Sequence, residues 1–383
     1  MPSKRYLLTP GPTPVPPEVL AAMAQPMVHH RGPDFRAVYS RCLERLREIY
    51  RTSSDVLLFT SSGSGGLESV IANVCAAGDR VLAVSAGHFG ERWAGIARLH
   101  GCDVHELTYE WGETPSADDL DARLDEIGGA KVVLLTHSET STGVVADVQA
   151  LAAVARGAGA LVAVDAVSSL GAVPLDTDDW HLDAVVSGSQ KALMCPPGLA
   201  FVAVSEAALE AASRLPQSGF YFDWRRTKEG QDVLDAPVTP AVSLVIALDV
   251  ALGLLLEEGL EAAFERHIRL GRACRAGVKA MGLELFSPDE DRSAVVTTLR
   301  VPEGVDAAAL LLDLRDRMGV QLIGGQGALK GKVVRIGHIG YYDVFDITTA
   351  LAALELGLSE AGAEIERGVA VTAALEAFEH TKV

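Results

Sequence analysis

The stretch LVAVDAVSSLG, residues 161–171, is a short apolar run that ends in an aspartate and continues into small polar residues. A run of this length bounded by turn residues is typical of a strand that is buried on both faces of a sheet. Asp165 then lies at the carboxyl end of the strand, where solvent is scarce. A carboxylate in that place either caps a turn or pairs with a buried cation, and the stretch alone leaves both interpretations open.

The same pattern recurs on both sides of this stretch. Short β-rich runs alternate with alanine- and leucine-rich segments of helical periodicity, which indicates an α/β protein with a mostly parallel sheet flanked by helices. The predicted strands cover residues 55–59, 80–85, 131–136, 160–165, 183–188 and 199–205. Helices are predicted between them, for example at 66–76 and 147–157.

The two ends of the chain differ from this pattern. Beyond about residue 240 a long helical stretch leads to short strands around 294–300 and 332–338, which indicates a smaller α+β domain. The start, TPGPTPVPP (9–17), cannot form a central strand because proline lacks the backbone donor, so we expect an extended arm laid over another surface. We therefore divide the chain into an arm (1–19), a large domain (20–255) and a small C-terminal domain (256–383).

The composition excludes several classes of function. Of the 383 residues 49% are hydrophobic and 22% charged, enough for a substantial core, and the formal net charge of −18 provides no basic surface for nucleic acid or anionic membranes. The five cysteines are scattered without metal-ligand spacing, so we expect reduced thiols and no metal site. No secretory signal or uninterrupted apolar span is evident, and we expect a cytoplasmic location.

Polar residues follow several of the predicted strands, at the edge where open parallel sheets bind ligands. After 55–59 comes TSSGSGGLES (60–69), a turn that opens a helix and offers N–H groups, hydroxyls and a positive helix end to a phosphate, although a plain flexible loop is an alternative. After 131–136 comes HSETSTG (137–143), in which His137, Glu139 and Thr140 supply hydrogen-bonding groups or form a structural turn.

Lys191, in VVSGSQKALMCPPG (185–198), has no charged neighbour closer in sequence than Asp183 and Glu206. Desolvation depresses the pKa of a lysine and makes it a usable nucleophile. A phosphate turn, an aspartate and an isolated lysine on separate strand ends fit pyridoxal 5'-phosphate: Lys191 binds the aldehyde, Asp165 keeps the pyridine nitrogen protonated, and the turn holds the phosphate.

LVAVDAVSSLG, SGSQKALMCPPG, THSETSTGV and KVVRIGHIG resemble the class V aminotransferases of fold type I, in the alanine–glyoxylate and serine–pyruvate branch. The resemblance covers essentially the whole chain from LLTPGPTPVP, and it implies a mostly parallel sheet of the seven-stranded type in the large domain. It implies that Lys191 attaches the cofactor, that Asp165 faces the pyridine nitrogen and that Arg335 grips the substrate carboxylate. The remaining cofactor contacts that it implies are Val167 on one ring face, Thr140 at the ring hydroxyl, and Ser64, Gly65, Gly66 and Gln190 at the phosphate.

Two positions depart from the family pattern or carry less support. Phe89, in GHFGERW, stands where this branch often has tryptophan, so stacking on the ring is retained and an indole donor is lost. Thr239, in PVTPAVSL, matches a residue that reaches the phosphate of the neighbouring subunit, but the tyrosine found upstream in relatives is absent. Because Thr239 would contact the cofactor of the neighbouring subunit, the resemblance implies a homodimer with active sites at the interface.

The resemblance implies transfer of an amino group from a small amino acid, serine or alanine, to glyoxylate or pyruvate. (S)-Ureidoglycine–glyoxylate transamination is an alternative that the sequence does not separate from it. A cysteine desulfurase or lyase would need a thiol before the carboxylate-binding arginine, and QLIGGQGALKGKVVR (321–335) has none. A pyridoxal-phosphate-binding accessory subunit is a further alternative, but Lys191, Asp165 and Arg335 each serve chemistry rather than packing.

Overall fold

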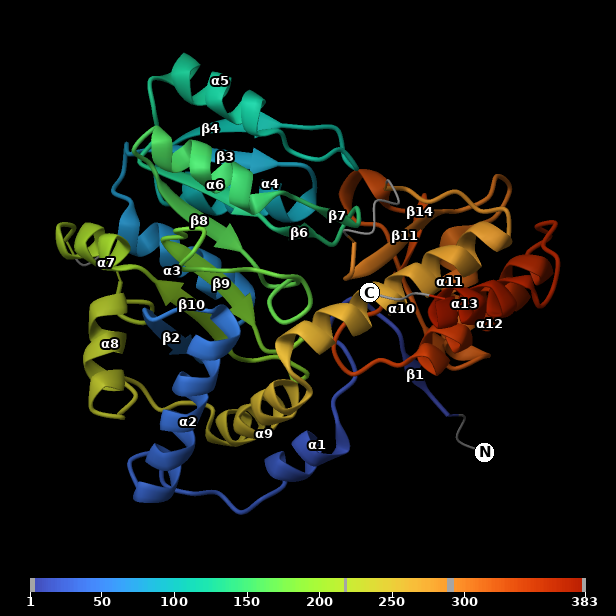
Figure 1. Cartoon of the computed structure of the whole chain (residues 1–383), viewed down its shortest axis with the longest axis horizontal. Coiled ribbons are helices and arrows are strands. Elements are labelled where there is room, and N and C mark those ends of the chain that lie inside the picture. Colours follow the sequence, from blue (N-terminus) through green and yellow to red (C-terminus); the bar gives the residue numbers. More distant parts are fainter. Residues whose placement is uncertain (1–3, 217–218, 288–292, 381–383) are drawn as a thin grey trace.

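A seven-stranded sheet lies at the centre of the larger part of the protein (Figure 1), in a computed structural model that describes residues 4–216, 219–287 and 293–380. Its strands, in spatial order, are β2 (Asp55–Phe59), β10 (Ala200–Val204), β9 (Ala184–Gly188), β8 (Leu161–Asp165), β5 (Val132–Thr136), β3 (Arg80–Ser85) and β4 (Asp103–Thr108). Only β10 runs antiparallel to its neighbours β9 and β2. The predicted mostly parallel sheet and all six predicted strands are confirmed.

The sequence analysis missed β4. Polar residues at 103, 105 and 106 interrupt its apolar pattern, and its side chains are only partly buried because β4 pairs on one side alone, with β3. An edge strand with one free side tolerates such residues, and a search for continuous apolar runs does not find it.

Helices cover both faces of the sheet because the strands are apolar on both faces. In β2, Val56 and Leu58 belong to one apolar core, and Leu57 and Phe59 belong to the other. The first face packs against α2 (Pro33–Tyr50), α5 (Ala117–Ile127), α6 (Val148–Gly157) and α9 (Val242–Glu258). The opposite face packs against α3 (Gly63–Val74), α4 (His88–Leu99), α7 (Glu206–Ser213) and α8 (Trp224–Asp232). The helices predicted at 66–76 and 147–157 are α3 and α6, and α3 begins three residues earlier than predicted.

The C-terminal part has its own sheet and core, beside the large part in Figure 1. Its antiparallel sheet has the order β11 (Val296–Arg300), β14 (Val333–Gly337), β13 (Ile323–Gly324). The helices α10 (Leu260–Ala280), α11 (Ala307–Asp316), α12 (Val344–Glu360) and α13 (Val369–His380) complete it. The division at residues 255 and 256 stays a prediction. It falls within α9, and the core of the large part continues to Phe264 in α10.

The N-terminal arm joins the two parts. Strand β1 (Tyr6–Leu7) pairs with β12 (Val320–Gln321), and the proline-rich segment that follows leads into α1 (Pro17–Met23). Thr13 binds the loop after β9, donating its N–H to the Gln190 carbonyl (3.2 Å) and its hydroxyl to the Lys191 carbonyl (3.0 Å). The described residues from 8 to 16 are extended as expected, but α1 begins at Pro17, so the last three residues of the predicted arm (1–19) are helical. The first three residues of that arm lie outside the described residues, and its boundary at residue 19 stays a prediction. Within the same described ranges, no helix is long and apolar enough to cross a membrane.

Candidate active site

Lys191 lies buried in the loop after β9, beneath the N-terminal arm. Its Nζ donates a hydrogen bond to the Pro10 carbonyl at 2.7 Å. Gly11 has a φ of +146°, and a Cβ on it would lie 2.5 Å from Lys191 Cε, so only glycine allows the arm to pass so close. Burial and then the nearby Arg335 charge lower the pKa of Lys191 to about 8. A substantial fraction of this amine is therefore neutral and nucleophilic near neutral pH.

Asp165 is the last residue of β8, and its carboxylate is buried. Its Oδ1 accepts a hydrogen bond from the Val167 N–H at 2.9 Å, while Oδ2 accepts none from the described residues. Burial raises the pKa of Asp165 to about 6, and the Val167 N–H and the positive charge of Lys191 oppose that rise. No direct ion pair joins Asp165 to Lys191 in the described part of the chain, so an oxygen of Asp165 stays available to a cationic partner.

At the expected phosphate turn, which opens α3, the N–H groups left free are not those of the predicted Gly65 and Gly66. The N–H groups of Gly65 and Gly66 donate to the Ser62 carbonyl at 2.9 and 3.3 Å, so both are already satisfied. Those of Gly63 and Ser64 donate to no described residue, and Arg92 Nη1 donates to Ser64 Oγ at 3.4 Å. An anion here would meet two free N–H groups, a guanidinium and the positive end of α3.

The two glycines of that turn have a packing role. A Cβ on Gly66 would lie 2.6 Å from Val186 Cγ1, and one on Gly65 would lie 2.8 Å from Phe222. Small residues therefore let α3 approach the sheet. The predicted phosphate contacts at Gly65 and Gly66 stay predictions, and the sequence analysis missed Arg92 and the free N–H of Gly63.

Gln190, Val167 and Phe89 lie around the same space. Oε1 of Gln190 is buried and has no hydrogen-bond partner in the structure as described, which fits a polar group that a ligand satisfies. Val167 lies against the start of α3, where a Cβ on Gly63 would be 2.7 Å from its Cγ2. Phe89, in the first turn of α4, stacks with the Arg92 guanidinium at 4.8 Å from the ring centroid.

Arg335 reaches the site from β14 of the C-terminal part. Its Nε donates to the Gly324 carbonyl at 2.9 Å, and its Nη1 donates to the Thr140 carbonyl at 2.8 Å. Burial lowers the pKa of Arg335 to about 10, and the charge of Glu139 opposes this effect. The described residues provide no acidic partner within salt-bridge distance, so a substrate carboxylate would be the first direct counter-ion of this buried cation.

Thr239 is the one predicted site residue that lies apart from the others. It is exposed in the segment between α8 and α9, and no hydrogen bond within the described ranges ties it to Lys191 or to the phosphate turn. Its predicted role requires a second subunit.

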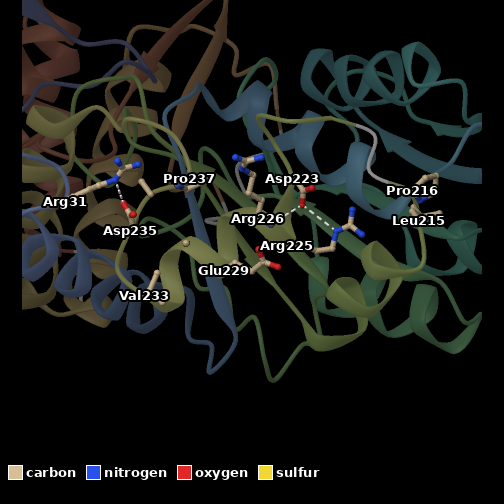
Figure 2. A pocket seen from close by; sticks show the side chains of 12 residues that line it. Arg31, Leu215, Pro216, Asp223, Arg225, Arg226, Glu229, Val233, Asp235 and Pro237 are labelled. Carbon is tan, nitrogen blue, oxygen red and sulfur yellow. Dashed lines mark hydrogen bonds and ion pairs between the residues drawn. The ribbon is translucent and has the colours of Figure 1, made fainter.

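A cavity of about 800 Å³ also lies away from Lys191. Figure 2 shows Arg31, Arg225 and Arg226 around it, together with Asp223 and Glu229. No residue predicted for catalysis lines this cavity. It is next to the Thr239 segment through Ala236 and Pro237.

The donor set around Lys191 fits pyridoxal phosphate. It combines an amine of lowered pKa, a buried carboxylate with a free oxygen, a phosphate turn and an unpaired buried guanidinium. When bound, the cofactor supplies an electron sink for the bonds to the substrate α-carbon. On this α/β fold, these residues define a pyridoxal-phosphate-dependent aminotransferase.

The chain belongs to the class-V aminotransferase family, which it matches over residues 5–344. It is 38% identical to the L-aspartate–glyoxylate aminotransferase of Paracoccus denitrificans, over 100% of this chain and 98% of the relative. It is 36% identical to the serine–glyoxylate aminotransferase of Methylorubrum extorquens, covering 97% and 96% of the two chains. A relative named soluble hydrogenase 42 kDa subunit, from Anabaena cylindrica, is 40% identical and covers 99% of this chain and 100% of its own.

A solved structure has nearly the same fold. The ureidoglycine–glyoxylate aminotransferase of Bacillus subtilis superimposes with a TM-score of 0.94 over 99% of both chains, at 34% sequence identity. The predicted fold type I architecture, cofactor and transaminase class are thereby confirmed.

Proposed function

We propose that this aminotransferase moves the amino group of a small monocarboxylic amino acid, serine or alanine, to glyoxylate, with pyruvate as a further acceptor. The observation that carries the proposal is the buried guanidinium of Arg335, which has no acidic partner within salt-bridge distance among the described residues. A planar guanidinium fork orients one carboxylate, and donor and acceptor both carry one on the carbon that reacts.

The names of the relatives favour glyoxylate as the acceptor, because the serine, aspartate and ureidoglycine enzymes are all named for it. They leave the donor open. An aspartate donor would need a second cation, and Arg92, which lies near the site, is engaged with Ser64, His88 and the Phe89 ring beside the phosphate turn. This supports a donor with one carboxylate. Ureidoglycine, which also has one carboxylate, remains the second candidate.

The roles proposed for the chain follow from these positions. Lys191 Nζ would take the proton that leaves the donor α-carbon and deliver it to a second carbon, on the bound cofactor, since its lowered pKa suits both taking and giving a proton. Arg335 holds the carboxylate, so the C–H bond keeps one orientation toward Lys191. Asp165 keeps a negative charge opposite the cation that forms at the pyridine nitrogen.

A donor and acceptor panel tests the substrate class. Serine or alanine with glyoxylate should react by ping-pong kinetics, and aspartate and glutamate should have a lower kcat/KM. Arg335→Lys should lower kcat/KM about 100-fold for donor and acceptor alike, because lysine cannot reproduce the fork. Ketoacid formation by wild type and variant gives the comparison.

The alternatives have distinct outcomes in the same panel. Aspartate outrunning serine and alanine by a wide margin would contradict the proposed donor class, and a strong preference for ureidoglycine would select the second candidate. Release of sulfur from cysteine without any ketoacid acceptor would indicate desulfurase chemistry. No turnover with any pair would favour an accessory role, as the name of the hydrogenase-subunit relative suggests for that protein.

We also propose that the active unit is a homodimer in which Thr239 reaches the phosphate held by the neighbouring subunit. Thr239 is exposed in the single chain, and the segment that carries it borders the large cavity in Figure 2. The exposed Phe220 and Val233 are near the same cavity, and their burial would favour association.

Sedimentation should give twice the chain mass of 40.3 kDa, and Thr239→Ala should weaken cofactor binding about tenfold without changing that mass. A fully active monomer would contradict the proposal.

Five cysteines without disulfides support a further proposal, that the protein works in the reducing cytoplasm.

A further inference from the structure

Glu139 is a buried carboxylate behind the cofactor site that no ion pair within the described ranges neutralises. It ends strand β6 (Ser138–Glu139), and four donors converge on its two oxygens. Oε2 accepts the N–H groups of Phe89 (2.9 Å) and Gly90 (3.2 Å), and Oε1 accepts the N–H (3.1 Å) and hydroxyl (2.6 Å) of Ser141. An ionised carboxylate is the only side-chain group of this size that accepts at every one of these positions.

Glu139 packs closely against the residue that precedes α4. A Cβ on Gly87, the residue before α4, would lie 2.6 Å from both Glu139 Cγ and Ser141 Oγ. The carboxylate therefore sits directly on the first turn of α4, where the helix dipole and the free N–H groups stabilise a negative charge. This explains how the chain keeps a charge in a buried place without a direct cation.

Two groups of the active site connect to Glu139 through the backbone. Phe89, the proposed ring-stacking residue, donates its backbone N–H to Glu139 Oε2. Thr140, the next residue in the chain, offers its carbonyl to Arg335 Nη1 at 2.8 Å. The Glu139 carboxylate thus holds the first turn of α4, which carries Phe89, and Glu139 itself precedes the residue whose carbonyl orients Arg335.

The charge of Glu139 also reaches the reacting groups through space. Burial lowers the pKa of Lys191 to about 8 and the pKa of Arg335 to about 10, and Glu139 opposes the shift of both. Three charged groups face Lys191: Arg335 from β14, Asp165 from β8 and Glu139 from β6. Glu139 and Asp165 are the two negative ones.

We propose that Glu139 is a positioning residue that holds Phe89 against the cofactor and supplies a fixed negative charge facing Lys191 and Arg335. It acts without touching the reacting atoms. The inference rests on the proposed placement of Phe89, and it assigns the HSETSTG segment a role beyond the cofactor contact of Thr140.

Two substitutions separate position from charge. Glu139→Gln keeps the length but directs an NH₂ group at N–H donors, so it should raise the cofactor Kd at least about tenfold and move the pH titration of the lysine-bound cofactor's visible absorption to lower pH. Glu139→Asp keeps the charge but shortens the reach, so it should weaken cofactor binding and leave that titration near wild type. Equilibrium dialysis and absorption spectra of the purified enzyme measure both quantities.

Glu355 provides the matched control. It is also a buried glutamate at a helix N-terminus, accepting the N–H groups of Gly368 (2.9 Å) and Ala370 (2.8 Å) at the start of α13, far from Lys191. Glu355→Gln should lower the melting temperature while the cofactor Kd and the titration stay within about twofold of wild type.

If Glu139→Gln only lowers the melting temperature, as Glu355→Gln is expected to, Glu139 is a structural cap and the inference is wrong. A Glu139→Asp titration shifted as far as that of Glu139→Gln would overturn the charge role. Neither outcome touches the proposed function, which depends on covalent labelling of Lys191 and on turnover. If Glu139→Gln does not fold, Ser141→Ala, which removes one of the four donors, should still raise the Kd by a smaller factor.

Discussion

Replacing Lys191 with alanine is expected to stop transamination while the protein still folds and binds the cofactor non-covalently. The side chain is buried and makes one hydrogen bond among the described residues, to the Pro10 carbonyl, whereas the N–H groups at the start of α3 are independent of it. The variant therefore loses the amine that we propose attaches the cofactor and carries the proton, and it keeps the free N–H groups at the start of α3. We expect kcat to fall by about 10⁴-fold or more, the scale of removing a catalytic nucleophile and base together.

Covalent labelling measures the same residue independently of turnover. The purified enzyme should be yellow, and borohydride should fix the cofactor on the Lys191 peptide. Because burial and Arg335 lower the pKa of Lys191 to about 8, the neutral amine becomes more abundant as pH rises through that value. The rate of cofactor attachment to the cofactor-free enzyme should rise over that range and then level off.

Lys228, a partly exposed lysine paired with Asp55 at 2.8 Å, supplies the control, since Lys228→Ala should retain both labelling and turnover. Cofactor fixed on a lysine other than Lys191 would contradict the assignment.

The sheet could be predicted from the sequence where its strands are buried on both faces. The runs that form β2, β3, β5, β8, β9 and β10 are short and almost wholly apolar, and turn residues bound each of them. β4 could not be found this way, because an edge strand is not required to be apolar on both faces. The antiparallel direction of β10 was equally inaccessible, since a strand's direction depends on how the connections run in space.

The residues of the candidate site also differ in how clearly the sequence indicates them. Lys191 and Asp165 could be predicted because each is a single charge at the end of an apolar run, a contrast visible in the sequence itself. Arg335 needed the family resemblance, because it lies within β14 and approaches the site from the other part of the chain.

What sequence analysis missed are contacts between distant segments. Pro10 meets Lys191 through its backbone carbonyl, which no side-chain pattern records. Arg92 meets the phosphate turn from α4, and Glu139 meets the first turn of the same helix from β6. The sequence does indicate that Glu139 and Thr140 are polar in an apolar neighbourhood, but only the fold identifies their partners.

Asp165→Asn is expected to separate catalysis from stability more sharply than any other substitution in the site. Oδ1 of Asp165 accepts the Val167 N–H at 2.9 Å, and the asparagine amide oxygen can keep that bond, so the variant loses the charge and little of the local structure. Without this carboxylate, the pyridine nitrogen would lose the group that we propose keeps it protonated. We expect kcat to fall about 10³-fold, by analogy with the loss of other preorganised electrostatic contacts.

Stability should change in the opposite direction. Burial raises the pKa of Asp165 to about 6, above its value of about 3.9 in an unfolded chain, so the folded cofactor-free protein binds the proton more tightly than the unfolded chain does. For the cofactor-free wild type, the part of the free energy of unfolding that comes from Asp165 therefore falls as pH rises from about 4 to about 6. Above that range the ionised, buried side chain lowers the free energy of unfolding. Asp165→Asn removes this cost, and its cofactor-free melting temperature at pH 7.5 should equal or exceed that of wild type.

Asp183→Asn is the matched control for this pair of effects. Asp183 is also buried beside the sheet, but its oxygens accept the Val162 N–H and the Ser205 hydroxyl, each at 2.8 Å, at the end of the strands away from Lys191. That variant should keep near wild-type kcat, because its carboxylate faces only structural donors. Near wild-type turnover in Asp165→Asn would remove Asp165 from the mechanism. A low kcat together with an unchanged or higher melting temperature would assign its charge to catalysis. Replacing a residue that is needed only for folding would lower both kcat and the melting temperature.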